Sequence, residues 1–318
     1  MRAVVVGGGS WGSAFACVLR DRGHDVTLAC RDAEQARAIA EIGRNPRYLK
    51  DASLRGIEAA TIEEAPIAET ELVVVAVPSR AFAGVIGALP GDAPVLSLTK
   101  GLDPATGERL STLVRGRPVA VLSGPNFAEE IAQGLPAAAV IASEDGFLAG
   151  RLQHAVNSVA FRVYVNPDPV GVELCAAAKN VIALAAGGVD GLGLGDNAKA
   201  ALITRGLAEM ARLGEACGAR SETFFGLAGM GDLTVTCWSR HSRNRQAGEL
   251  IARGASPDEA AAQIGQVVEG LTTAPVLRDL ASRVGVELPI TEGVCAVLAG
   301  QDLHQLAANL MGRQPTEE

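Results

Sequence analysis

The 318-residue sequence predicts an α/β protein in which a doubly wound, mostly parallel sheet is followed by an all-α domain. Short apolar runs alternate with helical segments over the first half, as in parallel sheets that helices cover on both faces. This strand pattern stops at Asn166-Pro167-Asp168-Pro169, where two prolines break the chain. Everything beyond has the pattern of helix and loop. We therefore expect domains at residues 1–169 and 170–318.

The composition is that of a globular protein, with 48% hydrophobic and 20% charged residues. A formal net charge of −8 argues against an extended nucleic-acid surface, although a small anionic ligand needs only a local cationic pocket. The six cysteines form no Cys-x-x-Cys pair and do not cluster with histidines, so we predict neither a metal site nor disulfides. The N-terminus reads as a strand rather than a signal peptide, and we expect a soluble, cytoplasmic protein without stable membrane insertion.

The first strand, Ala3–Val6, runs into Gly7-Gly8-Gly9-Ser10-Trp11-Gly12, and a helix from Ser13 to about Asp21 follows. Gly7, Gly9 and Gly12 fit the G-x-G-x-x-G pattern in the context of strand, tight turn and helix. Such glycines let the backbone approach a pyrophosphate, and the helix N-terminus offers it free N–H groups. The motif predicts a Rossmann-like dinucleotide-binding domain. The alternative is a glycine-rich turn that serves only close packing.

The end of the second strand, Val26–Cys30, indicates which dinucleotide binds. A carboxylate there binds the ribose hydroxyls of adenosine, whereas an arginine accommodates a 2′-phosphate. The sequence gives Arg31 and then Asp32. Arg31 favours NADP(H), and Asp32 can equally be the N-cap of the next helix. We therefore expect NADP or NAD, with NADP(H) favoured.

Five further apolar runs predict the rest of the sheet: Leu72–Val77, Pro94–Leu98, Val119–Leu122, Ala137–Ala142 and Val159–Val165. In such sheets ligands bind at the carboxyl ends of the strands. Thr99-Lys100-Gly101 and Ser123-Gly124-Pro125-Asn126 both occupy that position, although Lys100 alone could equally be a solvated loop lysine. Asp103-Pro104 is expected to begin a helix, with the proline in its first turn.

The all-α domain is organised around the stretch from Glu173 to Asp190, where every intervening residue is apolar or glycine except Lys179 and Asn180. A helix that is apolar on all sides is normally buried, and burial disfavours the charged form of lysine. Lys179 could extend to water or make a structural ion pair. The sharper hypothesis is that burial lowers its pKa, so that it exchanges a proton with a substrate. The polar pair at its middle argues against a membrane span.

A second polar motif lies further along the helical domain. Ser242-Arg243-Asn244 is expected to open a helix that runs to Ile251, and it offers a hydroxyl, a guanidinium and backbone N–H groups to a phosphate. The alternative is a charged surface loop. Asp232 is expected in a glycine-flanked loop from which it can reach Lys179. Other helices are predicted at 198–217, after a flexible connection at 191–197, and at 271–283 and 292–298, with a capping box at Ser256.

In combination these motifs resemble the soluble, bacterial-type NAD(P)-dependent glycerol-3-phosphate dehydrogenases over nearly the whole chain. Any one motif alone would be weak, but their number and order make the resemblance specific. The matching residues are 7–14, Arg31, Arg47-Tyr48-Leu49, 99–102, Ser123-Gly124-Pro125, Phe127-Ala128, 178–181, Gly231-Asp232-Leu233, Cys237, 242–245, 267–270, and Leu310-Met311 with Arg313.

The resemblance implies an enzyme that interconverts glycerol 3-phosphate and dihydroxyacetone phosphate by hydride transfer with NAD(P), supplying glycerol 3-phosphate for phospholipid synthesis. It also implies a possible homodimer. Lys179 would be the proton acceptor, with Lys100 contacting substrate and nicotinamide and Asp232 orienting Lys179 or the substrate. The implied substrate site comprises Lys100, Gly124, Asn126, Lys179, Asp232, Ser242, Arg243 and Asn244. Besides Gly7, Gly9 and Gly12, the implied cofactor contacts are Ser10, Trp11, Arg31, Tyr48, Lys100, Ala128, Arg243, Val267 and Glu269.

One residue departs from the family pattern, and two other functions stay open. Asn126 stands where a small hydroxyl residue is expected after Gly-Pro, which affects one substrate contact. The chain could instead be an NADP-dependent 3-hydroxyacid dehydrogenase with a Lys-Asn helix, in which Arg243 meets a carboxylate. It could also be a non-catalytic NADP-sensing protein, but such a sensor has no need of a buried base such as Lys179.

Overall fold

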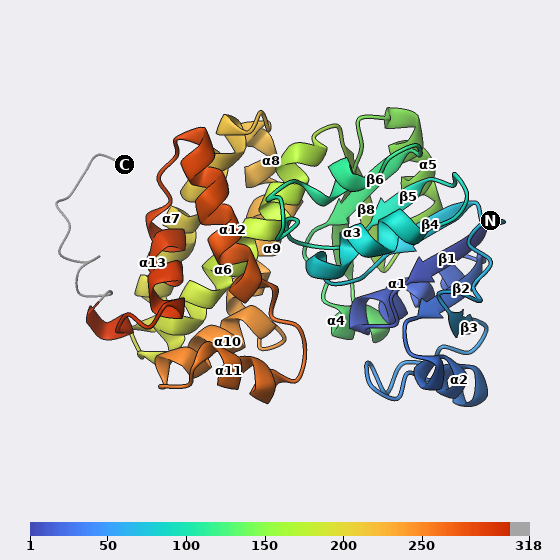
Figure 1. The fold of residues 1–318 in the computed structure, drawn as a ribbon, viewed down its shortest axis with the longest axis horizontal. Helices are drawn as coiled ribbons and strands as arrows, with labels where there is room; N and C mark the ends of the chain where they lie inside the picture. Colours follow the sequence, from blue (N-terminus) through green and yellow to red (C-terminus); the bar gives the residue numbers. More distant parts are fainter. Residues whose placement is uncertain (306–318) are drawn as a thin grey trace.

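The computed structural model describes residues 1–305, in which a sheet part and a helical part lie side by side (Figure 1). Eight strands form one sheet in the order β3-β2-β1-β4-β5-β6-β7-β8. All neighbouring strands are parallel except β6 and β7. The predicted fold class is therefore confirmed. The strands are β1 Arg2–Val6, β2 Asp25–Cys30, β3 Glu58–Thr61, β4 Leu72–Val75, β5 Val95–Ser97, β6 Val119–Ser123, β7 Ala137–Ala142 and β8 Phe161–Asn166.

Helices cover both faces of the sheet because successive strand residues point to opposite sides. Val5 belongs to a core with Phe15 of α1 and Leu152 of α5, whereas Val4 belongs to a core with Phe82 of α3. This two-sided burial explains why the strands read as continuous apolar runs. The helices of the sheet part are α1 Ser10–Asp21, α2 Ala33–Ile42, α3 Ser79–Ala88, α4 Ala128–Ala132 and α5 Gly146–Val156.

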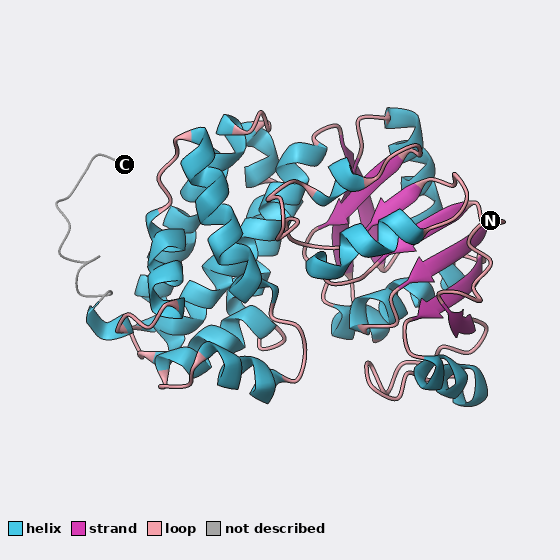
Figure 2. Ribbon diagram, viewed as in Figure 1, coloured by secondary structure: helices cyan, strands magenta, loops and turns pink. Residues whose placement is uncertain are grey.

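The second part contains only helices and loops within residues 169–305 (Figure 2). The last strand ends at Asn166 and the first helix of this part begins at Pro169, beside the predicted boundary. The helices are α6 Pro169–Gly191, α7 Gly195–Ala216, α8 Ser221–Phe225, α9 Asp232–Trp238, α10 Arg243–Ala252, α11 Pro257–Ile264, α12 Glu269–Val284 and α13 Pro289–Leu298. Leu310, Met311 and Arg313 of the family motif lie outside the described residues.

Helix α6 forms the axis of the helical part, and α7, α9, α10, α12 and α13 pack around it (Figure 1). By length and composition it could cross a membrane, but 89% of its apolar window is buried inside the protein. Glycines bring α10 into backbone contact with it: a Cβ on Gly248 would lie 1.9 Å from the carbonyl oxygen of Leu184. Near its start, Val172 packs with Val121 and Val140 of the sheet. Helix α6 therefore connects both parts of the molecule.

The structure corrects several expectations in the sheet part. Strand β3 was not predicted because its sequence, Glu-Ala-Ala-Thr, has no apolar run and lies at an edge of the sheet. Asp103 does not begin a helix. Its carboxylate instead accepts hydrogen bonds from the Thr106 amide (3.1 Å) and hydroxyl (2.8 Å), which closes a turn. Only a short 3₁₀ helix follows, at Leu110–Leu113. The eighth strand begins at Phe161 because Val159 lies fully exposed before it.

Two expectations in the helical part are also wrong. The connection predicted at 191–197 shrinks to residues 192–194, because α6 ends at Gly191 and α7 already begins at Gly195. Asp232 does not lie in a loop but is the first residue of α9, directly after a π-helical turn at Leu227–Gly231. The six cysteines are free thiols, as predicted, and five of them are buried.

Candidate active site

A buried ion pair between the two conspicuous charges of the helical part forms the centre of the site. Lys179 on α6 and Asp232 at the start of α9 are only 4% and 2% exposed. Lys179 Nζ lies 2.5 Å from Asp232 Oδ1 and 3.2 Å from Thr236 Oγ1, which is one turn further along α9. The ammonium therefore ends at Asp232 inside the protein and not in water. Lys179 does not snorkel.

The second oxygen of Asp232 connects this pair to the carboxyl ends of the sheet strands. Asp232 Oδ2 accepts hydrogen bonds from Lys100 Nζ (3.1 Å), Ser123 Oγ (3.1 Å) and the Gly124 amide (3.3 Å). Lys100 Nζ also donates to Asn126 Oδ1 at 2.9 Å. One carboxylate therefore lies between two ammonium groups, one from each part of the molecule. The predicted residues Lys100, Gly124, Asn126, Lys179 and Asp232 come together in one network.

Burial and neighbouring charges change the acidity of this cluster. Burial lowers the pKa of Lys179 from 10.5 to about 7; Asp232 opposes the change and Lys100 adds to it by like-charge repulsion. Burial alone would raise the pKa of Asp232, but the ammonium groups of Lys100 and Lys179 lower it below its ordinary value. Asp232 therefore stays anionic while Lys179 can exchange a proton near neutral pH.

The predicted anion-binding motif lies next to this cluster at the start of α10. Ser242 caps the helix, its hydroxyl accepting from the Arg245 amide at 3.2 Å. Asn244 Nδ2 donates to Asn180 Oδ1 at 2.9 Å, and Asn180 follows Lys179 directly on α6. Arg243 is exposed and gives one guanidinium N–H to the Val267 carbonyl at 2.9 Å. The hydrogen bond between Asn180 and Asn244 thus connects the start of α10, which carries Arg243, to the part of α6 that carries Lys179.

The glycine-rich loop has the geometry of a pyrophosphate cradle. Gly7 has φ +121°, and a Cβ there would meet the Ala76 carbonyl at 2.3 Å. A Cβ on Gly12 would lie 1.9 Å from the Gly7 carbonyl, so this glycine allows the helix to pack on the loop. Gly9 faces open space, and no side chain caps α1 there. A ligand can therefore approach the loop at Gly9 and reach the free N–H groups of α1. The residues fit a dinucleotide.

The other predicted cofactor residues of the sheet part lie around this loop. Ser10 and Trp11 begin α1, Arg31 follows β2 and Ala128 begins α4. Tyr48 belongs to the connection after α2. The Trp11 ring packs edge-on against Phe15 and Phe161 at 5.7 and 6.5 Å, and its buried Nε1 has no partner within the described residues. Their contacts with the dinucleotide stay predictions.

Glu269, the first residue of α12, joins the helical part to the sheet part. The Glu269 carboxylate accepts hydrogen bonds from the Ser79 hydroxyl (2.7 Å) and amide (3.3 Å) at the start of α3. Burial raises the pKa of Glu269 although these hydrogen bonds oppose the change. The Gly270 amide donates to Asn244 at 2.8 Å. The start of α12 therefore contacts both α3 and α10, and the predicted cofactor roles of Glu269 and Val267 stay predictions.

Sequence reasoning missed Thr236 and gave no individual role to Asn180 or Ser123. Thr236 contacts Lys179, Asn180 holds Asn244, and Ser123 donates to Asp232. The helical spacing of Asp232 and Thr236, four residues apart, would have indicated Thr236 had Asp232 been assigned to a helix. Asn180 and Ser123 were part of recognised motifs, but nothing in their spacing pointed to their partners.

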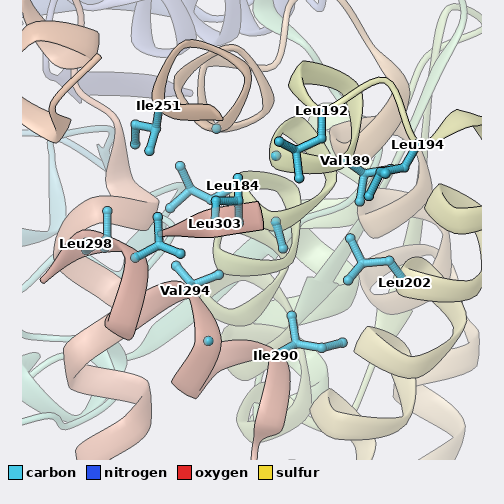
Figure 3. A pocket seen from close by; sticks show the side chains of 15 residues that line it. Leu184, Val189, Leu192, Leu194, Leu202, Ile251, Ile290, Val294, Leu298 and Leu303 are labelled. Carbon is cyan, nitrogen blue, oxygen red and sulfur yellow. The ribbon is translucent and has the colours of Figure 1, made fainter. Parts of the chain in front are cut away.

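The helical part also contains an apolar pocket (Figure 3). Leu184, Leu202 and Val294 are among the side chains that line it, and none of its described lining residues is charged. These residues therefore offer no group for proton transfer. Within residues 1–305 no group of three or more His, Cys, Asp or Glu side chains could hold a metal ion.

Comparisons with known proteins agree with this architecture. Residues 2–149 match the family model for the NAD-dependent glycerol-3-phosphate dehydrogenase N-terminus, and residues 168–308 match the model for its C-terminus. The glycerol-3-phosphate dehydrogenase [NAD(P)+] of Moorella thermoacetica is 45% identical over 99% of this chain and 96% of its own length. That of Shouchella clausii is 42% identical over 100% and 97%.

A solved structure of similar extent gives the same result. The glycerol-3-phosphate dehydrogenase of Coxiella burnetii has a TM-score of 0.94 to this chain at 37% identity, covering 98% of this chain and 99% of its own. The family models, full-length relatives and shared three-dimensional structure all agree with the motifs read from the sequence. The chain belongs to the NAD-dependent glycerol-3-phosphate dehydrogenase family.

Proposed function

We propose that this protein interconverts glycerol 3-phosphate and dihydroxyacetone phosphate with NAD(P), NADP(H) being favoured, and that it supplies glycerol 3-phosphate for phospholipid synthesis in the cytoplasm. The observation that supports this most directly is the buried Lys179–Asp232–Lys100 cluster beside the Arg243 corner. A base with a pKa near neutrality next to a phosphate-binding motif suits a phosphorylated alcohol. Family membership supports the same reaction. The expected homodimer is part of this proposal, and sedimentation velocity would test it.

Proton transfer falls to Lys179. In the oxidation, neutral Lys179 takes the hydroxyl proton of glycerol 3-phosphate; in the reduction, its ammonium returns that proton to the carbonyl oxygen of dihydroxyacetone phosphate. A dinucleotide held at the Gly7–Gly12 loop would supply the hydride chemistry at the same carbon. With its pKa at about 7, Lys179 is available in both protonation states near neutral pH. Asp232 and Thr236 hold its Nζ in position.

The residues around Lys179 orient the substrate. Lys100 can polarise the reacting oxygen because its Nζ shares Asp232 with Lys179. Asn126 Nδ2 is buried and has no partner within the described residues, so it can donate to a substrate oxygen. This supports a substrate role for Asn126 despite its departure from the family pattern. Arg243 uses one N–H on Val267, which leaves further guanidinium donors for the phosphate.

A steady-state assay tests the proposed reaction. The purified protein should oxidise NADPH, and NADH less well, when dihydroxyacetone phosphate is added, and should be much slower with keto acids derived from 3-hydroxyacids. Turnover of the keto acids alone would support a hydroxyacid dehydrogenase. Silence with every substrate, while the dinucleotide still binds, would support a sensor.

Arg243→Ala tests the substrate class. The wild type should use glycerol 3-phosphate far better than glycerol, and the variant should lose roughly 2–5 kcal/mol of this preference in kcat/KM if the phosphate contact is desolvated. Arg240→Ala is a matched control, because Arg240 is exposed on the preceding loop. NADPH affinity measured in the same variants separates a cofactor role of Arg243 from a phosphate role. If Arg243→Ala retains the preference for phosphate, the anion binds elsewhere.

A further inference from the structure

The end of strand β2 carries two conflicting signals for cofactor choice, and the structure distinguishes them. In dinucleotide-binding sheets the adenosine ribose lies at this position, where a carboxylate holds the 2′-hydroxyl or an arginine accepts a 2′-phosphate. Here Arg31 and Asp32 are adjacent. A role for either residue in cofactor choice depends on the proposed function only through the binding of a dinucleotide at the Gly7–Gly12 loop.

The carboxylate of Asp32 is already engaged on both oxygens. Asp32 Oδ1 accepts hydrogen bonds from the amides of Glu34 (2.9 Å) and Gln35 (3.2 Å), which makes it the N-cap of α2. Asp32 Oδ2 lies 2.5 Å from Nη2 of Arg47. A ribose hydroxyl could use only the remaining acceptor position of Oδ2, beside the Arg47 guanidinium. Asp32 therefore serves the fold of this corner and is poorly placed to select NAD.

Arg47 reaches this position because a buried asparagine ties its turn to the glycine loop. Asn45, 1% exposed, accepts from the amides of Arg47 (3.1 Å) and Tyr48 (3.2 Å). Its Nδ2 donates to the Gly8 carbonyl and to Ser13 Oγ, both at 2.9 Å. The arginine is thus held at a fixed place relative to the loop on which the pyrophosphate would lie. The backbone of Arg47 is fixed by this hydrogen bond to Asn45, although its side chain is exposed.

Two guanidinium groups at this corner can bind an anion. Arg47 pairs with Asp32, whereas Arg31 makes no ion pair within the described residues. The Arg47 side chain is 53% exposed, so its fork is accessible to a ligand. Planar guanidinium groups match phosphate oxygens in pairs, whereas a ribose hydroxyl needs a free acceptor.

We propose that Arg47 is a second specificity-determining residue, which binds the 2′-phosphate of NADP(H) together with Arg31, and that the Asp32–Arg47 pair holds it in place for this contact. Tyr48, which shares the Asn45 anchor, then lies beside the same adenosine. The preference for NADP(H) over NAD then arises from Arg31 and Arg47, and from the pairing of the Asp32 carboxylate with Arg47 instead of with a ribose hydroxyl.

Two fragments that differ only in the 2′-phosphate isolate this contact: 2′,5′-ADP and 5′-AMP, titrated calorimetrically into the full-length protein. The wild type should bind 2′,5′-ADP more tightly. Arg47→Ala should lose on the order of 10-fold to 100-fold affinity for 2′,5′-ADP, as for one charged hydrogen bond, with little change for 5′-AMP. Arg31→Ala should behave alike. Arg44→Ala, which removes an exposed arginine of the same connection, is the matched control and should change neither.

Asp32→Asn tests whether the Asp32 carboxylate serves as the N-cap of α2 or binds the ribose hydroxyls. It retains a capping side chain, so α2 should stay intact by circular dichroism, and 5′-AMP affinity should not fall. A large loss of 5′-AMP binding in Asp32→Asn, or an equal loss of both fragments in Arg47→Ala, would overturn the proposal. Fragment binding needs no substrate. A protein that binds the fragments as expected but does not turn over dihydroxyacetone phosphate would contradict only the proposed function.

Discussion

Two carboxylates in the helical part are similarly buried, but their pKa values are shifted in opposite directions. Asp232, beside the sheet, and Glu209 of α7 are 2% and 4% exposed. Asp232 lies between two ammonium groups, and its pKa is lowered although burial alone would raise it. Glu209 has no ion-pair partner within the described residues. It accepts from the amides of Ile290 (2.6 Å) and Thr291 (3.4 Å) at the start of α13, and the charge of Arg212 acts on it without an ion pair. Burial raises its pKa to about 7 in spite of these hydrogen bonds.

This difference teaches that burial alone does not decide the charge of a group in this protein; its partners do. Backbone amides support a helix end without holding a full negative charge at Glu209. Two lysines hold that charge at Asp232, and Asp232 in return keeps Lys179 in place. The ionic cluster lies where both parts of the molecule meet. Changes there should therefore affect the reaction, and changes at Glu209 should affect stability alone.

Lys179→Ala should have the largest effect. Removing the group that we propose transfers the proton should slow turnover by about 10²–10⁴-fold, while NADPH affinity stays nearly unchanged. Lys199→Ala is the matched control: Lys199 is also a buried lysine paired with an aspartate, Asp190, at 2.8 Å. Its loss should lower the free energy of unfolding without a comparable loss of kcat. Near-normal kcat in Lys179→Ala would mean that this lysine is structural.

Asp232→Asn removes the negative charge that lies between the two lysines. Removing one partner of a buried ion pair should destabilise the protein by about 3–5 kcal/mol, because the remaining ammonium is left uncompensated. The loss relative to wild type should grow as the pH falls below about 7, where wild-type Lys179 becomes charged against its carboxylate. Urea unfolding at acidic and alkaline pH measures this difference. A loss that is the same at both would show that the charge of Lys179 does not matter.

Glu209→Gln should gain stability over wild type as the pH rises, whereas Asp232→Asn should lose stability and should lose most at low pH. The folded pKa of about 7 lies above the ordinary 4.5, so the stability that Glu209 contributes is complete below 4.5 and is lost as the pH rises through 7. A shift of this size corresponds to about 3 kcal/mol. Glutamine does not titrate, so the variant should gain stability relative to wild type between pH 5 and 8, with kcat unchanged. Parallel unfolding curves across that range would contradict the raised pKa.

What the sequence could predict depended on local pattern. The glycine loop needs only a strand, three glycines and a helix start, and Lys179 stands out because its helical surroundings are apolar. Asp232 was matched to Lys179 correctly, but its helix was missed because glycines 229 and 231 read as loop. Family motifs predicted the remaining site residues from other sequences rather than from local physical pattern.

Contacts between distant segments left no such pattern. Glu209 meets Ile290 across 81 residues, and Asn45 reaches back to Ser13 across 32. Nothing in either neighbourhood indicates the partner, because each contact exists only after the helices or the glycine loop have packed. The same holds for Arg47: the family motif includes it, but nothing in the sequence indicates its contact with Asp32.

Lys100→Ala should have the smallest effect on stability. It tests whether the charge of Lys100 contributes to the lowered pKa of Lys179. Lys100 repels the charged form of Lys179 through the shared Asp232, so its removal should raise the pKa of Lys179 towards its ordinary value. Oxidation of glycerol 3-phosphate needs neutral Lys179, so the rise of kcat with pH should move to higher pH in the variant. Lys100→Arg retains the charge and should leave the midpoint of that rise in place, even if kcat changes. An unchanged midpoint in Lys100→Ala would mean that burial alone sets the acidity of Lys179, and that the sheet part supplies a substrate contact but no control over the base.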